Sequence, residues 1–103
     1  MRHYSEKKLD KLIEKATIDC YSDYEARSGF GATLEDELTV PFRATVLGED
    51  VVVNEIIDKG DRIVAVIRKD KKLHNISILD LKDMKPANYA LWIEAYRKFL
   101  RES

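Results

Sequence analysis

An uninterrupted apolar run, Ile63-Val64-Ala65-Val66-Ile67, constrains the fold of this chain more than any other feature of the sequence. A strand whose successive side chains are all apolar buries both of its faces, so we expect a central strand over residues 62–69. Turn residues at 48–50, 59–60 and 70–71 separate this run from three other β-like runs, at 42–47, 51–58 and 73–79. Four strands joined by three tight turns predict an antiparallel meander.

The segment before the meander has helical periodicity. An apolar stripe at three- and four-residue steps predicts one amphipathic helix over residues 5–28, with Ser5 as N-cap; the stripe consists of Leu9, Leu12, Ile13, Ala16, Cys20 and Tyr24. Gly29 suits the left-handed residue that follows a helix, so we expect the helix to end there. A turn or two of a second helix is predicted through residues 34–38, and Pro41 forces Val40 toward extended geometry.

The segment after the meander predicts a loop over residues 80–87 and then a closing helix that Asn88 caps. An aromatic stripe at helical spacing marks the buried face of this helix: Tyr89, Trp92, Ile93, Tyr96, Phe99 and Leu100. The predicted fold class is therefore α+β. It has a long N-terminal helix and a short second helix, a four-stranded antiparallel meander or small open barrel, and a C-terminal helix. The length of 103 residues predicts a single domain over residues 1–103.

Composition excludes several function classes. One cysteine (Cys20) and two histidines (His3 and His74) leave no zinc-finger type of site within one chain. No apolar stretch approaches the ~18 residues of a membrane span, and the charged N-terminus does not resemble a signal peptide, so we expect a cytoplasmic protein without membrane contact. No nucleotide-binding, hydrolase, metalloprotease or EF-hand motif is present, so we expect no enzyme.

The formal net charge of −1 argues against a general nucleic-acid binder but hides an uneven distribution. Residues 1–50 carry net −4 and residues 51–103 net +3, and the acidity peaks over residues 17–50, which carry net −6. Asp19 and Asp23 lie four residues apart on the predicted first helix, and Glu35-Asp36-Glu37 follow. Carboxylates at this density suit Ca²⁺, which takes six to eight oxygen ligands. They also suit helix capping, dipole complementation or plain solvation.

Other features have structural explanations beside the functional ones. Cys20 on the apolar stripe reads as a core residue, and His74 as a structural residue in a strand, rather than as a nucleophile and its base. The aromatic stripe reads as core rather than as a stacking platform for bases. The basic residues of the C-terminal half, among them Arg68–Lys72, Arg97, Lys98 and Arg101, read as a solvated face. The alternative function is a small-barrel interaction module that binds a protein or a nucleic acid through this basic half.

Three stretches together form a recognisable signature: residues 18–25 (IDCYSDYE), Gly29-Phe30, and residues 34–44 (LEDELTVPFRA). This signature resembles the cyanobacterial-type calcium-binding proteins, the CcbP-like domain family. The close match covers about 27 residues, and beyond Leu47 the likeness is one of layout.

The resemblance implies a small bacterial protein that binds calcium outside any EF-hand, as a cytoplasmic Ca²⁺ buffer or sensor. Its implied partner is the calcium ion, and a protein partner is left open. The implied metal ligands are the acids within the motif and their close neighbours, namely Asp19, Asp23, Glu25, Glu35, Asp36 and Glu37. The near-neutral charge departs from the strongly acidic character of that family and implies fewer sites or weaker binding.

Overall fold

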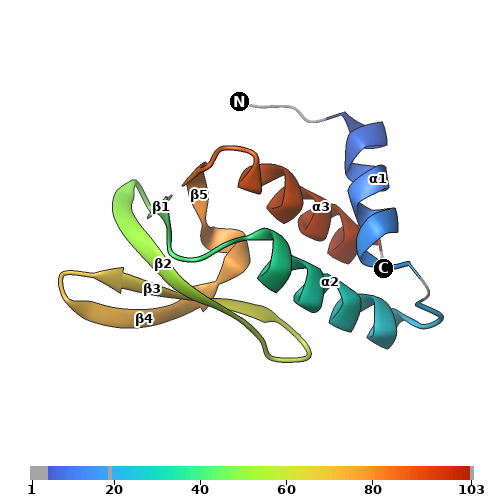
Figure 1. Ribbon diagram of the computed structural model, residues 1–103, viewed down its shortest axis with the longest axis horizontal. Helices are drawn as coiled ribbons and strands as arrows, with labels where there is room; N and C mark the ends of the chain where they lie inside the picture. Colours follow the sequence, from blue (N-terminus) through green and yellow to red (C-terminus); the bar gives the residue numbers. More distant parts are fainter. Residues whose placement is uncertain (1–4, 19, 103) are drawn as a thin grey trace.

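A five-stranded antiparallel sheet lies on one side of the molecule and three helices gather on the other (Figure 1). The computed structural model describes residues 5–18 and 20–102. Its elements in chain order are α1 (Glu6–Ala16), α2 (Asp23–Glu37), β1 (Phe42–Val46), β2 (Glu49–Asp58), β3 (Ile63–Lys69), β4 (Lys72–Ser77), the 3₁₀ turn η1 (Ile78–Asp80), β5 (Lys82–Lys85) and α3 (Tyr89–Glu102). The predicted α+β class is confirmed.

The first four strands form the predicted meander, and β5 then returns to pair with β1, which gives the strand order β4-β3-β2-β1-β5. The prediction of four strands is wrong by one, because β5 forms within residues 80–87, where the sequence predicts a loop. This strand buries only Met84 of its four side chains, so it depends on pairing with β1 rather than on its own apolar pattern. The apolar run lies inside the sheet as β3, but the middle strand is β2.

The predicted helix over residues 5–28 is two helices. α1 ends at Ala16, and the Thr17 hydroxyl donates to the carbonyl of Ile13 at 2.7 Å. α2 begins anew with Ser22 as its N-cap, whose side-chain oxygen accepts from the N–H of Glu25 at 3.1 Å. The apolar stripe continues in phase across the break, which is why periodicity alone predicts one helix. Tyr24, the last residue of that stripe, is 74% exposed.

Gly29 does not end a helix but lies inside α2, which continues to Glu37. The predicted short helix over residues 34–38 is the last part of this same helix. Phe30, Leu34 and Leu38 repeat every four residues along it and are all buried. Through these side chains α2 packs against β2, and they form the centre of the core between the helices and the sheet.

The aromatic stripe of α3 is core, as predicted. Trp92, Ile93 and Tyr96 are buried, and the ring of Phe30 lies 5.3 Å from that of Tyr96 and 5.0 Å from that of Phe99. Trp92 and Tyr96 of the stripe are buried, and Tyr89 and Phe99 are half-buried against the core, so the stripe is core rather than a surface on which bases could stack. Among the described residues, no helix is long and apolar enough to cross a membrane.

A buried lysine, Lys98, joins the first helix to the last, so the prediction that its side chain belongs to a solvated face is wrong. The side chain of Lys98 in α3 is 7% exposed, and its ammonium pairs with Asp10, with Glu6 at 2.7 Å and with Glu102 at 3.7 Å. Hydrogen bonds to Asp10 and then to Glu6 raise the pKa of this ammonium well above its usual range. α1, which packs mainly on α3 rather than on the sheet, is therefore fixed by charge as well as by its apolar stripe.

Candidate functional site

Among the predicted calcium ligands whose side chains the structure describes, namely Glu25, Glu35, Asp36 and Glu37, no three lie close enough together to hold a metal ion. Asp19 lies outside the described residues, and Asp23 is the first residue of α2. The Glu25 carboxylate accepts the N–H of Tyr21 at 3.1 Å, while its own N–H donates to Ser22. This exchange resembles a capping box, so Glu25 stabilises the start of α2.

Glu35, Asp36 and Glu37 are consecutive on α2, where successive side chains point about 100° apart. Glu35 accepts the N–H of Asp58 at 3.3 Å, and Glu37 pairs with Lys15 at 3.3 Å, whereas Asp36 is exposed. Within the described part of the chain, no three His, Cys, Asp or Glu side chains are grouped closely enough to hold a metal ion. The expectation that these three acids converge is therefore not met.

One carboxylate of this set, Glu35, lies instead beside acids that the sequence pattern does not single out. We call Glu35, Glu55 and Asp58 the acidic corner, because all three line a cavity of about 310 Å³ where α2 meets β2. β2 extends beyond β1: Val53 of β2 pairs with Phe42, the first residue of β1, and residues 54–58 of β2 follow. On the edge of β2 that faces β1, these last five residues have no strand partner. Glu35 fills part of this gap by accepting the N–H of Asp58.

The position of Asp58 depends on a glycine. Its carboxylate lies against Gly31 of α2, where a Cβ would collide with it, and its other oxygen accepts the N–H of Gly60 at 2.9 Å. The charge of Asp58 also acts on the buried phenol of Tyr96. Burial raises the pKa of this phenol, the charges of Asp58 and Asp61 raise it further, and Arg27 lowers it. The sequence signal for the contact between α2 and Asp58 is Gly31, which lies one helical turn before the acidic Glu35. That Asp58 is the partner of Gly31 is shown by the tertiary structure.

Cys20 and His74 lie in different parts of the fold. Cys20 is half-buried in the connection between α1 and α2, where its thiol donates to the main-chain carbonyl of Glu25 at 3.4 Å. His74 is exposed on the edge strand β4. The prediction of Cys20 as a core residue is met only in part, because it lies at the rim of the core.

A row of basic side chains crosses the sheet on the face away from the helices. Lys85 of β5 is paired with Arg43 of β1, Arg43 with Val52 of β2, and Val52 with Arg68 of β3. We call Lys85, Arg43 and Arg68 the basic row. All of them line a groove of about 490 Å³, in which Asp50 and Asp70 form a neighbouring acidic row.

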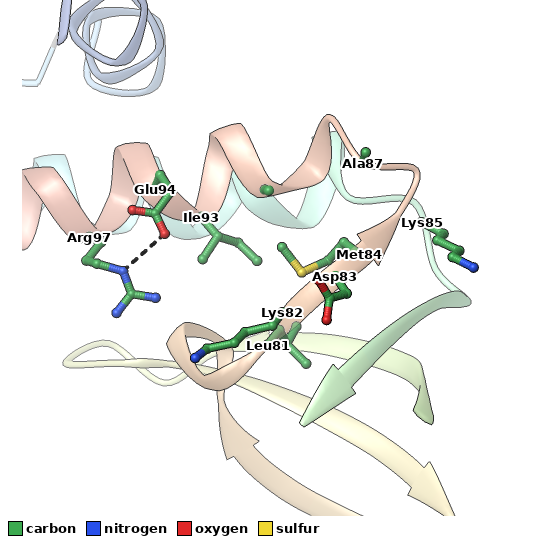
Figure 2. Close-up of a pocket in the computed structure, with 10 residues that line it drawn as sticks. Leu81, Lys82, Asp83, Met84, Lys85, Ala87, Ile93, Glu94 and Arg97 are labelled. Carbon is green, nitrogen blue, oxygen red and sulfur yellow. Dashed lines mark hydrogen bonds and ion pairs between the residues drawn. The ribbon is translucent and has the colours of Figure 1, made fainter. Parts of the chain in front are cut away.

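A cavity of about 810 Å³ lies between β5 and α3. Figure 2 shows Ile93 of α3 facing Leu81 and Met84 across it, with Glu94 and Arg97 at the rim. The Arg97 guanidinium donates to the carbonyl of Leu79 at 2.8 Å and lies 3.4 Å from the Glu94 carboxylate. The apolar floor of this cavity consists of the core residues Leu81, Met84 and Ile93, and the charges of Glu94 and Arg97 at its rim pair with each other.

These features define an α+β protein in which a helical layer covers one face of a small open sheet. No family model and no curated protein sequence matches the chain. The fold is similar to that in the crystal structure of Anabaena CcbP, with a TM-score of 0.67 over 89% of this chain and 90% of that one, at 15% sequence identity. The CcbP-like fold that the sequence resemblance implies is thereby confirmed.

Proposed function

We propose that this protein binds Ca²⁺ and catalyses no reaction, and that Glu35 and Asp58 of the acidic corner supply two of the ligands. The observation that carries the proposal is the cavity lined by Glu35, Glu55 and Asp58, in a chain with a CcbP-like fold. The sequence resemblance independently implies calcium as the ligand. Of the ligands that it implies, Glu35 is the one that lines this cavity.

The acidic corner fits Ca²⁺ only loosely. Calcium takes six to eight oxygens at flexible geometry, and the described carboxylates are not grouped tightly enough to hold an ion by themselves. Main-chain carbonyls on the unpaired end of β2 and water would complete the coordination. Few converging carboxylates give weak binding, so we expect a dissociation constant of about 10⁻⁴–10⁻³ M, the weak end of protein calcium sites.

Calcium titration followed by calorimetry and by thermal unfolding tests this proposal, with Mg²⁺ as the competing ion. A ligand at tenfold excess over its dissociation constant stabilises the fold by about 1.4 kcal/mol, which is visible as a rise in Tm. Glu35→Gln and Asp58→Asn should reduce the rise, whereas Glu14→Gln, an exposed acid of α1, should not. The absence of any shift at about 10 mM Ca²⁺ would contradict the proposal. Loss of the shift in Asp36→Asn alone would place the site elsewhere.

A further inference from the structure

Two arginines of the basic row straddle a short apolar side chain. Arg43 and Arg68 lie on β1 and β3, with Val52 of β2 directly between them. Strands two apart are separated by about 10 Å, so two long guanidinium side chains can reach one group above Val52. Lys85, next to Arg43 on β5, adds a third positive charge at one end of the row.

These three cations are exposed, and none of them has an ion-pair partner within 4 Å among residues 5–18 and 20–102. Two other charges of the groove are engaged: Lys69 pairs with Glu49, and Asp83 accepts the hydroxyl of Thr45 at 2.9 Å. The row therefore carries three positive charges that form no ion pair within the described part of the chain, in a hollow rather than on a convex surface.

We propose that the basic row binds the phosphate groups of a compact phosphorylated small molecule. Guanidinium groups bind phosphate oxygens in pairs through parallel hydrogen bonds, and two of them facing one position suit a phosphate better than a single carboxylate. The groove volume of about 490 Å³ lies within the usual range for small-molecule sites. This binding function is distinct from calcium binding at the acidic corner.

The acidic row selects a compact ligand over a nucleic-acid strand. Asp50 and Asp70 line the same groove, and residues two apart on a strand are about 7 Å apart, so a long polyanion leaving the basic row in that direction meets repulsion. None of the described residues lining the groove is aromatic, so bases have no side chain on which to stack. The net charge of −1 adds no long-range attraction for nucleic acid.

Calorimetric titration of the full chain with sodium tripolyphosphate tests the proposal, in EDTA so that no metal bridges the phosphates. Sodium chloride at matched ionic strength is the blank. We expect saturable binding, weakened about tenfold by Arg43→Gln and about tenfold by Arg68→Gln. Arg62→Gln, an exposed arginine on the β2–β3 turn, is the matched control and should bind as the unmodified chain does. Circular dichroism and Tm confirm that each variant is folded.

Asp50→Asn combined with Asp70→Asn provides a test of opposite sign, because removing the acidic row should strengthen binding severalfold. No saturable heat with tripolyphosphate, or equal affinity in Arg43→Gln, Arg68→Gln and Arg62→Gln, would overturn the proposal. A single-stranded RNA oligonucleotide that binds more tightly than tripolyphosphate, with steep salt dependence, would replace the compact ligand with a nucleic acid.

Discussion

A methyl group added at Gly29 would lie 2.6 Å from the main-chain carbonyl oxygen of Ala16. The last turn of α1 thus lies directly over the middle of α2, and the contact exists because position 29 has no side chain. The thiol sulfur of Cys20 lies 3.2 Å from the same point, so the connection between the two helices folds against this glycine as well.

We therefore expect Gly29→Ala to destabilise the protein by about 1–3 kcal/mol, the usual effect of overpacking. Alanine would otherwise favour an internal helical position by up to about 1 kcal/mol, but the obstructing atom is main chain and cannot rotate away. Urea unfolding measures the difference. Ser28→Ala, an exposed position in the same helix, should change stability by less than about 0.5 kcal/mol. Equal stability of Gly29→Ala and the unmodified chain would show that α1 can shift freely.

Gly31 gives a second glycine test, in which the obstructing group is the Asp58 carboxylate. Gly31→Ala should push that carboxylate away and weaken its hydrogen bond to Gly60, at a cost of about 1–2 kcal/mol. Asp58→Ala removes the obstruction, so the double variant should be more stable than the sum of the single effects by about 1 kcal/mol. A double-mutant cycle in urea measures this coupling, and strict additivity would contradict the contact.

Stability should fall in alkaline solution because of Lys98. The folded-state pKa of its ammonium is raised by Asp10 and then by Glu6, so above about pH 10.4 the unfolded chain loses this proton first. The stabilisation is complete below that pH and is lost as pH rises through the folded-state pKa. Lys98→Met should flatten the decline in urea midpoint above pH 10.

Tyr96 contributes to the same loss of stability at alkaline pH, because the pKa of its phenol is raised in the folded state. The main cause of this shift is burial. Tyr96→Phe should therefore remove a separate part of the decline, and the two variants should differ in the pH at which the loss begins. A decline identical in all three proteins would contradict both assignments.

The start of α2 depends on Ser22 and Glu25. Ser22→Ala should cost about 1 kcal/mol, the usual loss of an N-cap side chain. Glu25→Gln should have a smaller effect, because the amide oxygen can still accept the N–H of Tyr21. Calcium titrations of both variants should match the unmodified chain. A large loss of calcium response in Glu25→Gln would assign Glu25 a ligand role that its capping contacts do not suggest.

The parts of the fold that depend on periodicity could be predicted from the sequence. The alternation of β1 and the aromatic stripe of α3 each indicate buried side chains, and the structure buries Phe42 and Ala44 of β1 and Trp92, Ile93 and Tyr96 of α3. In β4 the same reasoning is less successful, because none of its described side chains is fully buried. The helix break at residues 17–22 could not be predicted this way, because the apolar stripe keeps its phase across it. β5 could not either, because Lys-Asp-Met-Lys has one apolar side chain and is a strand only beside β1.

Of the candidate site, the sequence predicts the acidic character but not which acidic residues lie together. The acidity of residues 17–50 draws attention to α2, but neighbours in sequence such as Asp36 and Glu37 point in different directions on a helix. Glu35 meets Asp58 across 23 positions through a hydrogen bond to the strand backbone. Such a pairing follows from how α2 crosses β2, and no local pattern encodes it.

β1 gains its two strand partners at different times as the chain is synthesised, because β2 follows it directly and β5 comes much later. Arg43 pairs with Val52, nine positions later, and with Lys85, 42 positions later, so one edge of β1 has no partner until β5 has been made. An unpaired edge is a template for another chain, and non-local pairing is slow to form. Nascent chains that end before β5 are therefore the species most prone to self-association.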